Sequence, residues 1–332
     1  MLDSARSSAS APMTIGFALT PRFTQMAFVS AIETLRLANH VAGRSIYAWK
    51  AFSEDGAPVA ASNGMTSPVD GAFASMGAAI VIVCGGLDIQ ATNHHALMQR
   101  LRKLATRGVT LGALCTGPYV LAKAGLLDGH RCTIHWENLP SFREEFPQLE
   151  VTQELYEIDR GRMTCAGGTA AIDMFLSLIE RREGGDVAAQ VTDELIHHRM
   201  RDKGERQRMD LRARIGVAHP KLIAIIGQME KRLENPASCA QLAREAGLSA
   251  RQLERLFQKY IGDSPTRYYL QLRLDRARFL LMQTSMPILS VGLACGFVSA
   301  SHFSKCYSEH FRKTPSEERK RVAPRKARAG AD

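Results

Sequence analysis

Residues 109–129 read VTLGALCTGPYVLAKAGLLDG. A short apolar run ends at Cys115, Thr-Gly-Pro follows at once, and an amphipathic helical pattern then begins. Several α/β enzymes present a nucleophile on such a sharp turn between a strand and a helix. The stretch therefore predicts an α/β fold, and it makes Cys115 the first candidate for a functional residue.

The sequence around this turn alternates between strand-like and helix-like runs. The β-branched run at 78–86 ends in two glycines, which is typical of a buried parallel strand. We expect strands at 13–19, 46–53, 78–86 and 109–114, a strand pair at 156–165, and helices at 28–39, 95–108, 116–127 and 169–185. This alternation predicts a parallel, flavodoxin-like sheet with helices on both faces.

The composition is that of an ordinary globular chain, since 45% of the 332 residues are hydrophobic and 23% are charged. No apolar run reaches the ~18 residues that a membrane span needs, and the N-terminus lacks the apolar core of a secretory signal. The seven cysteines are scattered without a CxxC spacing. This pattern argues against a disulfide framework and a zinc site, and it favours a reducing, cytoplasmic location. We expect no metal, no cofactor and no membrane partner.

The positive charge is concentrated towards the end of the chain. The net charge is +10, and residues 236–332 carry 17 Lys and Arg against 8 Asp and Glu. A near-neutral region followed by a basic one indicates a polyanionic partner. Double-stranded DNA fits better than a membrane surface, because no long basic helix has a strongly apolar face.

Residues 238–260, SCAQLAREAGLSARQLERLFQKY, contain two short helical patterns around Gly247. Gly247 suits the turn, and Ser249 is a suitable N-cap for the second helix. The apolar residues of that helix share one face. The opposite face carries Arg251, Glu254, Arg255 and Gln258. An anchored back and a basic, hydrogen-bonding front are what a recognition helix needs in the major groove.

The same pattern returns at 287–311, with a turn at Gly296. The outward-facing residues of its second helix are Ala300, Ser301, Ser304, Lys305 and Ser308. A long helical run at 264–284 joins the two units and can hold two recognition helices about 34 Å apart, one turn of DNA.

These patterns divide the chain into five parts. We expect a disordered leader (1–13), an α/β ligand-sensing domain (14–185), a helical linker (186–235), an all-α domain with two helix-turn-helix units (236–319) and a basic disordered tail (320–332).

The elements G-x-S-P, L-R-x-x-x-A-R and G-F-x-S-x-x-H-F-S occur as GDSPTRYYLQLRLDRARFLL and CGFVSASHFSKCY. Together they resemble the signature of the AraC/XylS family over about residues 236–319. The resemblance implies a DNA-binding domain whose recognition helices enter successive major-groove segments. It also implies that seven of the outward positions face the bases: Arg251, Glu254, Arg255, Ala300, Ser301, Ser304 and Lys305.

The stretches MTIGFAL, AIETLRLAN, VIVCGG, GALCTGPYVLAKAGLLDG, HW and TCAGGTAAIDM lie within about 14–180. As an assembly they resemble the PfpI-type, class I glutamine-amidotransferase-like domain. In PfpI-type enzymes a histidine and a carboxylate from the loop after the first strand activate the elbow cysteine, because the thiolate is the reactive form. Cys115 and His135 match two members of this set. The matching loop, 23–27, holds no acid, and Glu33 lies about two helical turns farther along.

This incomplete set leaves three interpretations of Cys115 open: a nucleophile, a small buried residue that fits a tight turn, or the floor of a ligand pocket. The turn exposes backbone N–H groups at a helix N-terminus, which can bind a carboxylate, and open α/β sheets bind ligands at the carboxyl ends of their strands. Trp136 and Tyr119 are either ordinary core residues or an aromatic surface for a quaternary ammonium. The candidate ligand-binding residues are Cys115, Thr116, Gly85, Gly86, His135, Trp136 and Glu33.

The combination of the two domains resembles the GlxA group of transcriptional regulators, and within it the regulators of glycine betaine, carnitine and arginine catabolism. The resemblance implies a cytoplasmic homodimer that binds promoter DNA, works with RNA polymerase and activates catabolic genes. Its effector would be a betaine-, carnitine- or arginine-like molecule. The alternative is a PfpI-type cysteine hydrolase or hydratase fused to a DNA-binding module. A constitutive architectural DNA-binding protein would not need the large α/β domain.

Overall fold

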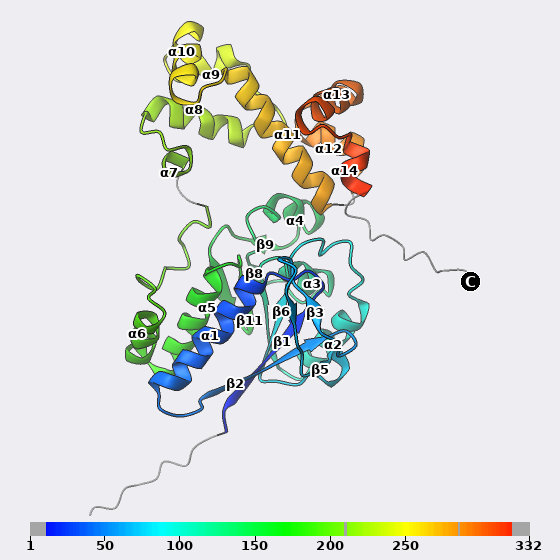
Figure 1. The fold of residues 1–332 in the computed structure, drawn as a ribbon, viewed down its shortest axis with the longest axis vertical. Helices are drawn as coiled ribbons and strands as arrows, with labels where there is room; N and C mark the ends of the chain where they lie inside the picture. The colour runs from blue at the N-terminus through cyan, green and yellow to red at the C-terminus, as the bar shows by residue number, and fades with distance from the viewer. Residues whose placement is uncertain (1–10, 209–210, 285, 321–332) are drawn as a thin grey trace, which may run out of the picture. The chain divides into compact units, whose positions relative to one another are not determined.

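The computed structural model describes residues 11–208, 211–284 and 286–320, and the chain divides into two compact units, Met1–Gln207 and Arg208–Asp332 (Figure 1). The expected leader and tail fall almost wholly outside the described residues. The expected linker is shared between the units: α6 (Gly185–Glu194) packs into the core of the first, and α8 (Pro220–Lys231) into a core of the second. The domain boundaries otherwise remain a prediction.

A seven-stranded sheet with the order β10-β11-β7-β6-β1-β2-β5 forms the centre of the first unit. Its neighbouring strands are parallel except for the antiparallel pair β10–β11. The strands are β1 (Met13–Leu19), β2 (Tyr47–Ser53), β5 (Gly71–Ala72), β6 (Ile80–Cys84), β7 (Thr110–Leu114), β10 (Tyr156–Asp159) and β11 (Arg162–Cys165). Two small sheets pair β3 (Val59–Ala60) with β4 (Thr66–Ser67) and β8 (Arg131–Cys132) with β9 (Glu150–Val151). The expected parallel sheet and the expected strand pair are confirmed.

Helices cover both faces of this sheet, as expected. Side chains alternate along a strand, so Ile80 and Ile82 of β6 enter one core while Val81 and Val83 enter the other. The first core is closed by α1 (Gln25–Val41), α5 (Ala170–Glu183) and α6, and the second by α2 (His95–Ala105), α3 (Pro118–Lys123) and α4 (Leu139–Glu145). A single 3-10 turn, η1 (Phe73–Ser75), precedes β6.

The strand order fixes where a ligand site can form. From β1 the chain moves to β2 on one side, whereas β6 and β7 continue on the other side, so the order reverses between β1 and β6. Open α/β sheets bind ligands at the carboxyl ends of the strands beside such a switch point. Cys115 directly follows β7, next to β6, and therefore lies at this edge.

The second unit consists of short helices arranged on one long helix, α11 (Pro265–Gln283) (Figure 1). Tyr269 of α11 belongs to a core with Leu253 and Phe257, whereas Leu274 belongs to another core with Phe303. The remaining helices are α7 (Leu211–Ile215), α9 (Cys239–Glu245), α10 (Ala250–Tyr260), α12 (Ile288–Ala294), α13 (Ala300–Phe311) and α14 (Pro315–Lys320). The two expected helix-turn-helix units are α9–α10 and α12–α13, each with its own core. Among the helices within the described ranges, none is long and apolar enough to span a membrane.

Candidate DNA-binding surface and elbow site

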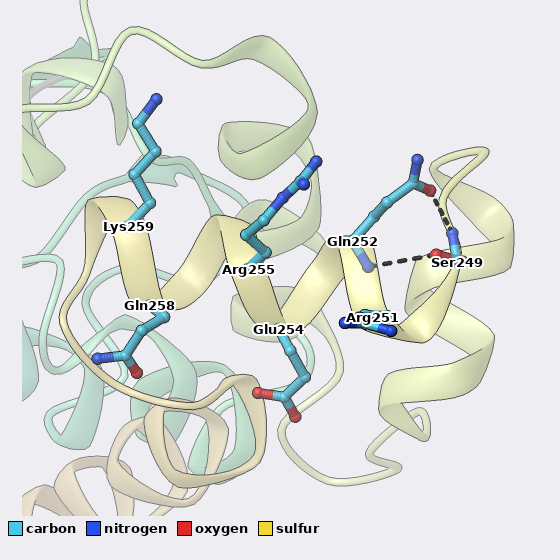
Figure 2. A pocket seen from close by; sticks show the side chains of 7 residues that line it. All are labelled: Ser249, Arg251, Gln252, Glu254, Arg255, Gln258 and Lys259. Atoms are coloured by element: carbon cyan, nitrogen blue, oxygen red, sulfur yellow. Dashed lines mark hydrogen bonds between the residues drawn. The ribbon is translucent and has the colours of Figure 1, made fainter.

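The helix α10 is fixed at its start and along its back. Ser249 accepts a hydrogen bond from the backbone N–H of Gln252, and the Gln252 side chain accepts one from the N–H of Ser249, which completes a capping box (Figure 2). Leu253 and Phe257 are buried. The back of the helix is therefore held in place while its front stays open.

The front of α10 carries the expected residues in two rows. Figure 2 shows Arg251, Glu254 and Gln258 along one row, and Gln252, Arg255 and Lys259 along the other. Gln252 and Lys259 extend the surface beyond the sequence-based prediction. Arg251, Glu254 and Arg255 are all exposed, and no salt bridge within the described ranges engages them.

The second unit presents a smaller surface on α13. Ser299 caps the helix by accepting from the N–H of His302 at 3.4 Å, and Phe303 and Tyr307 are buried behind it. Ala300, Ser301 and Lys305 are exposed, and Ser304 is half-buried. The structure therefore gathers all seven predicted DNA-facing residues on two open helix surfaces, while their contacts with bases remain a prediction.

Arg273 of α11 holds the turn between α12 and α13. Its Nε donates to the carbonyl of Cys295 and its Nη2 to the carbonyl of Gly296, both at 2.8 Å. The guanidinium also lies 4.2 Å from the centre of the Phe297 ring. Arg273 thus satisfies carbonyls that the end of α12 leaves unpaired. The arginine in the L-R-x-x-x-A-R pattern was visible in the sequence, but its partners were not.

The elbow at Cys115 has the expected sharp backbone turn. Cys115 has a φ of 60°, a left-handed conformation that a residue other than glycine rarely adopts. Its N–H donates to the carbonyl of Cys165, and its carbonyl accepts from the N–H of His135, both at 3.1 Å. A Cβ on Gly85 would lie 2.2 Å from the backbone nitrogen of Gly117, so Gly85 lets the turn pack against the end of β6.

The thiol of Cys115 is paired with a hydroxyl. Thr24, in the loop between β1 and α1, donates its Oγ1 hydrogen to Cys115 Sγ at 3.2 Å. Burial raises the pKa of the Cys115 thiol, and the hydrogen bonds from the Thr24 hydroxyl and the Thr116 N–H offset only part of this effect. The missing acid marks the loop 23–27 in the sequence, but no sequence signal marks Thr24 as the residue that contacts the thiol.

His135 follows the small strand β8 and is half-buried. Burial lowers its pKa, and the Glu137 carboxylate, whose Oε2 lies 3.8 Å from His135 Nδ1, opposes this effect. The imidazole is therefore neutral at neutral pH. The backbone of His135 joins the elbow, but within residues 11–208 its ring makes no hydrogen bond to Cys115 Sγ.

The structure places the other predicted ligand-binding residues in different surroundings. Thr116 is buried, and its hydroxyl donates to the carbonyl of Gly86 at 2.7 Å, so it belongs to the elbow. Glu33 pairs with Arg36 on the surface of α1, about 13 Å along the helix from Thr24 at 1.5 Å per residue. Glu33 is therefore not brought to the elbow. Trp136 is 36% exposed and lies beside the His135 ring.

Tyr119 belongs to the core rather than to a ligand site. It is 3% exposed, and its hydroxyl donates to Glu145 Oε1 at 2.8 Å. This outcome agrees with the core interpretation that the sequence left open.

An ion pair that sequence reasoning did not find lies at the edge of the elbow. Arg22, after β1, pairs with Asp88, after β6, and both have left-handed φ values of 59° and 57°. Their loops are joined by a bridge between Phe23 and Gly86 and by the N–H of Leu87, which donates to the carbonyl of Arg22. No local sequence signal marks the pair, because its members lie in separate loops. The fold thus places one cation and one carboxylate beside the switch point.

All seven cysteines are free thiols. Across the described residues, no group of three or more His, Cys, Asp or Glu side chains is placed to hold a metal ion.

The second unit carries two recognition-type helices on a shared core helix, and the first is an α/β unit with a cysteine elbow. Together these features define a helix-turn-helix regulator with a PfpI-like domain. A model described as "Helix-turn-helix domain" matches residues 242–321, and that of the DJ-1/PfpI family matches residues 13–181.

Curated relatives extend this match over nearly the whole chain. The sequence is 47% identical over 315 residues to the HTH-type transcriptional regulator CdhR of Pseudomonas aeruginosa, which covers 94% of this chain and 93% of CdhR. It is 46% identical over 309 residues to the HTH-type transcriptional regulator GbdR of the same species, a match that covers 93% of this chain and 84% of GbdR. It is 37% identical over 309 residues to the HTH-type transcriptional regulator GlxA of Rhizobium meliloti, a match that covers 92% of this chain and 95% of GlxA.

A crystal structure of an AraC family transcriptional regulator from Pseudomonas putida is also similar, with a TM-score of 0.52 and 30% identity over 55% of this chain and 100% of that one. The chain belongs to the family of transcriptional regulators that combine a DJ-1/PfpI domain with an AraC-type helix-turn-helix domain.

Proposed function

We propose that this regulator binds promoter DNA through α10 and α13, and that its DJ-1/PfpI domain senses a small metabolite without catalysing a reaction. The observation that supports sensing over catalysis is the pairing of Cys115 Sγ with the Thr24 hydroxyl. The family's enzymes have a carboxylate in the corresponding loop. The named relatives are transcriptional regulators.

The surroundings of the elbow favour a neutral, unreactive thiol. Nucleophilic cysteines need a lowered pKa, supplied by a cationic histidine, a base or a helix N-terminus. At this elbow burial raises the pKa of Cys115 and lowers that of His135. Both groups are then neutral at pH 7, and within residues 11–208 no ion pair engages Cys115.

The charges at the switch point support one class of effector. Arg22 and Asp88 form a neutral pair in the two loops that border the elbow. A zwitterion can exchange partners with such a pair, its carboxylate binding Arg22 and its cation Asp88, without adding net charge to the site. Leu87, next to Asp88, exposes an apolar surface suited to N-methyl groups. We infer a betaine-, carnitine- or arginine-like effector.

The regulatory output completes the proposal. We infer a cytoplasmic homodimer that activates catabolic genes by recruiting RNA polymerase to the promoter. The two helix-turn-helix units carried by α11 suit recognition of successive major-groove segments.

One substitution separates sensing from catalysis. In Cys115→Ser, we expect glycine betaine, carnitine or L-arginine to shift the melting temperature as in the unaltered protein, and effector-dependent reporter expression to persist. Cys239→Ser, in the second unit, serves as the matched control. Loss of the reporter response while the melting shift persists would favour the alternative, a cysteine hydrolase or hydratase fused to a DNA-binding module.

A second substitution tests the DNA-binding surface. Arg255→Ala should weaken binding of a selected operator by about 1–3 kcal/mol and relax the preference at one base position. Arg267→Ala, an exposed arginine of α11 outside both recognition helices, is the control. An Arg255→Ala protein with an unchanged site preference would contradict the assignment.

A further inference from the structure

The segment 196–207 leads out of the first unit, and we call it the strap. It follows α6 and ends at Gln207, the last residue before the second unit. At its start, Ile196 has a left-handed φ of 51° although it is β-branched, and its side chain is 93% exposed. A β-branched residue adopts this conformation only under constraint. That constraint comes from the C-terminal end of α6, because the N–H of Ile196 donates to the carbonyl of Asp193 and the N–H of His197 donates to the carbonyl of Thr192.

The middle of the strap is held by a fully buried carboxylate. Asp173, on the first turn of α5, is 0% exposed. Its Oδ1 accepts from the Arg201 N–H at 2.8 Å and lies 3.1 Å from His197 Nε2. Its Oδ2 accepts from Arg201 Nε at 3.0 Å and Nη2 at 2.6 Å, and Nη2 also donates to Thr169 Oγ1 at 2.9 Å. Arg201 therefore fixes the strap to the start of α5.

The end of the strap is held by Gln207. Its Nε2 lies 2.9 Å from Thr133 Oγ1, 3.1 Å from the carbonyl of Ile134 and 2.9 Å from the carbonyl of Glu154. The two hydrogens of this amide are shared among three acceptors. Between the two attachment points, the carbonyl of Lys203 accepts from the N–H of Leu155, so the strap runs beside the segment that precedes β10.

The two attachment points of the strap, Arg201 and Gln207, bind residues that lie next to the segments in contact with Cys115. Ile134 immediately precedes His135, whose N–H donates to the Cys115 carbonyl. On the other side, Thr169 closely follows Gly167, where a Cβ would lie 2.6 Å from the Cβ of Cys115. The strap is thus bonded to the two segments that pack against Cys115 on either side.

We propose that Arg201 and Gln207 are positioning residues that couple the elbow to the strap, and through the strap to the chain entering the helix-turn-helix unit. The proposal rests on the proposed function, because it describes how an effector at the elbow is reported to the DNA-binding unit. An effector that displaces the His135 segment or the start of α5 alters the hydrogen bonds of Gln207 or Arg201. The strap then changes its position relative to the sheet.

Hydrogen exchange of the full-length protein tests the coupling without an effector. Gln207→Leu removes the amide, and Gln207→Met does so while keeping the unbranched chain. In both variants we expect the His135 amide, which is bonded to Cys115, to exchange at least about fivefold faster. Arg199→Lys is the matched control, because Arg199 pairs with Glu205 inside the strap and touches neither attachment point. If the His135 amide of either folded Gln207 variant exchanges at the same rate as in Arg199→Lys, the proposal is overturned.

A second measurement uses glycine betaine, carnitine and L-arginine as probes. For a probe that shifts the melting temperature of the unaltered protein, Gln207→Leu and Arg201→Lys should keep that shift but lose the probe-dependent change in operator affinity. Retention of both effects in these variants would overturn the coupling. If no probe shifts the unaltered protein, the effector class fails, and the exchange experiment still decides the role of Gln207.

Discussion

Gly86 shows how little space the elbow leaves for side chains. A Cβ at this position would lie 2.0 Å from the carbonyl oxygen of Arg22 and 2.7 Å from Cα of Phe23. These atoms belong to backbone that is bridged to Gly86, so they cannot move away independently. The glycine is required by the close approach of two loops.

We therefore predict that Gly86→Ala lowers the free energy of unfolding by about 3 kcal/mol, mainly through overpacking. Gly77→Ala is the control, since a Cβ there meets nothing within 4 Å and its backbone is not left-handed. Urea unfolding followed by tryptophan fluorescence measures both. A Gly86→Ala protein as stable as Gly77→Ala would show that the two loops are not packed together.

The Thr24 hydroxyl has a measurable effect on the neighbouring thiol. Its hydrogen bond to Sγ favours the thiolate, so Thr24→Val should raise the pKa of Cys115 further. At a fixed pH below that pKa, alkylation of Cys115 by iodoacetamide should slow, because a smaller fraction of the thiol is ionised. Peptide mass spectrometry follows this single cysteine.

Thr24→Ser keeps the hydroxyl and should leave the alkylation rate close to that of the unaltered protein. Equal rates in the valine and serine variants would show that the hydroxyl does not donate to Sγ.

Short local patterns mark the elbow residues in the sequence: Cys115 and Thr116 lie in a strand–turn–helix pattern, and two glycines directly follow the β-branched run of β6. Cys115, Thr116 and the glycines after β6 were predicted on this basis. The Arg22–Asp88 pair and the Thr24–Cys115 contact were missed, because they join residues from separate loops that only the folded sheet brings together. Glu33 was considered for its charge, but the geometry of α1 directs it to Arg36 instead.

At the scale of single elements, α11 explains why two helix-turn-helix units form one domain. Its first half closes one core and its second half another, so each unit packs against a different stretch of the same helix. The sequence predicted the helices and turns from capping residues and apolar spacing, which are local signals. It did not predict the division into two cores, which depends on how the short helices pack.

Arg273 connects α11 to the second of these cores, and its replacement should weaken that unit. Arg273→Lys loses the two-pronged contact with the carbonyls of Cys295 and Gly296, since an ammonium cannot reproduce the planar fork. We expect the free energy of unfolding of the second unit to fall by about 2 kcal/mol.

Circular dichroism at helical wavelengths measures this loss, with Arg267→Lys as the exposed control. Operator affinity should fall with it, because the turn positions α13. A loss of affinity without a loss of stability would instead indicate that Arg273 contacts DNA directly.

At the scale of the whole molecule, the two units have separate cores and different sets of ionisable groups. Cys84, Cys115, Cys132 and Cys165 are buried in the first unit, and burial raises the pKa of each thiol, to about 12 for Cys132 and Cys165. In the second unit this holds for Cys295, also with a pKa of about 12. Alkaline pH should therefore act mainly on the first unit.

The sign of the effect follows from proton binding. Unfolded thiols ionise near pH 8.5 whereas the buried thiols remain protonated, so the folded state binds more protons above this pH. The stability that comes from keeping the thiols neutral is fully present below about pH 8.5. It is lost as the pH rises towards the folded pKa values, by up to roughly 1.4 kcal/mol per pH unit for each thiol.

Tryptophan fluorescence isolates the first unit in this experiment, because Trp49 and Trp136 are the two tryptophans of the chain. Between pH 8 and 9.5, we expect the fluorescence-detected urea midpoint to fall more steeply than the transition of the second unit seen by circular dichroism. Cys132→Ala removes one of the four buried thiols and should make the fall shallower, whereas Cys239→Ala, in the second unit, should not. Parallel shifts of both transitions would mean that the two units unfold as one cooperative body.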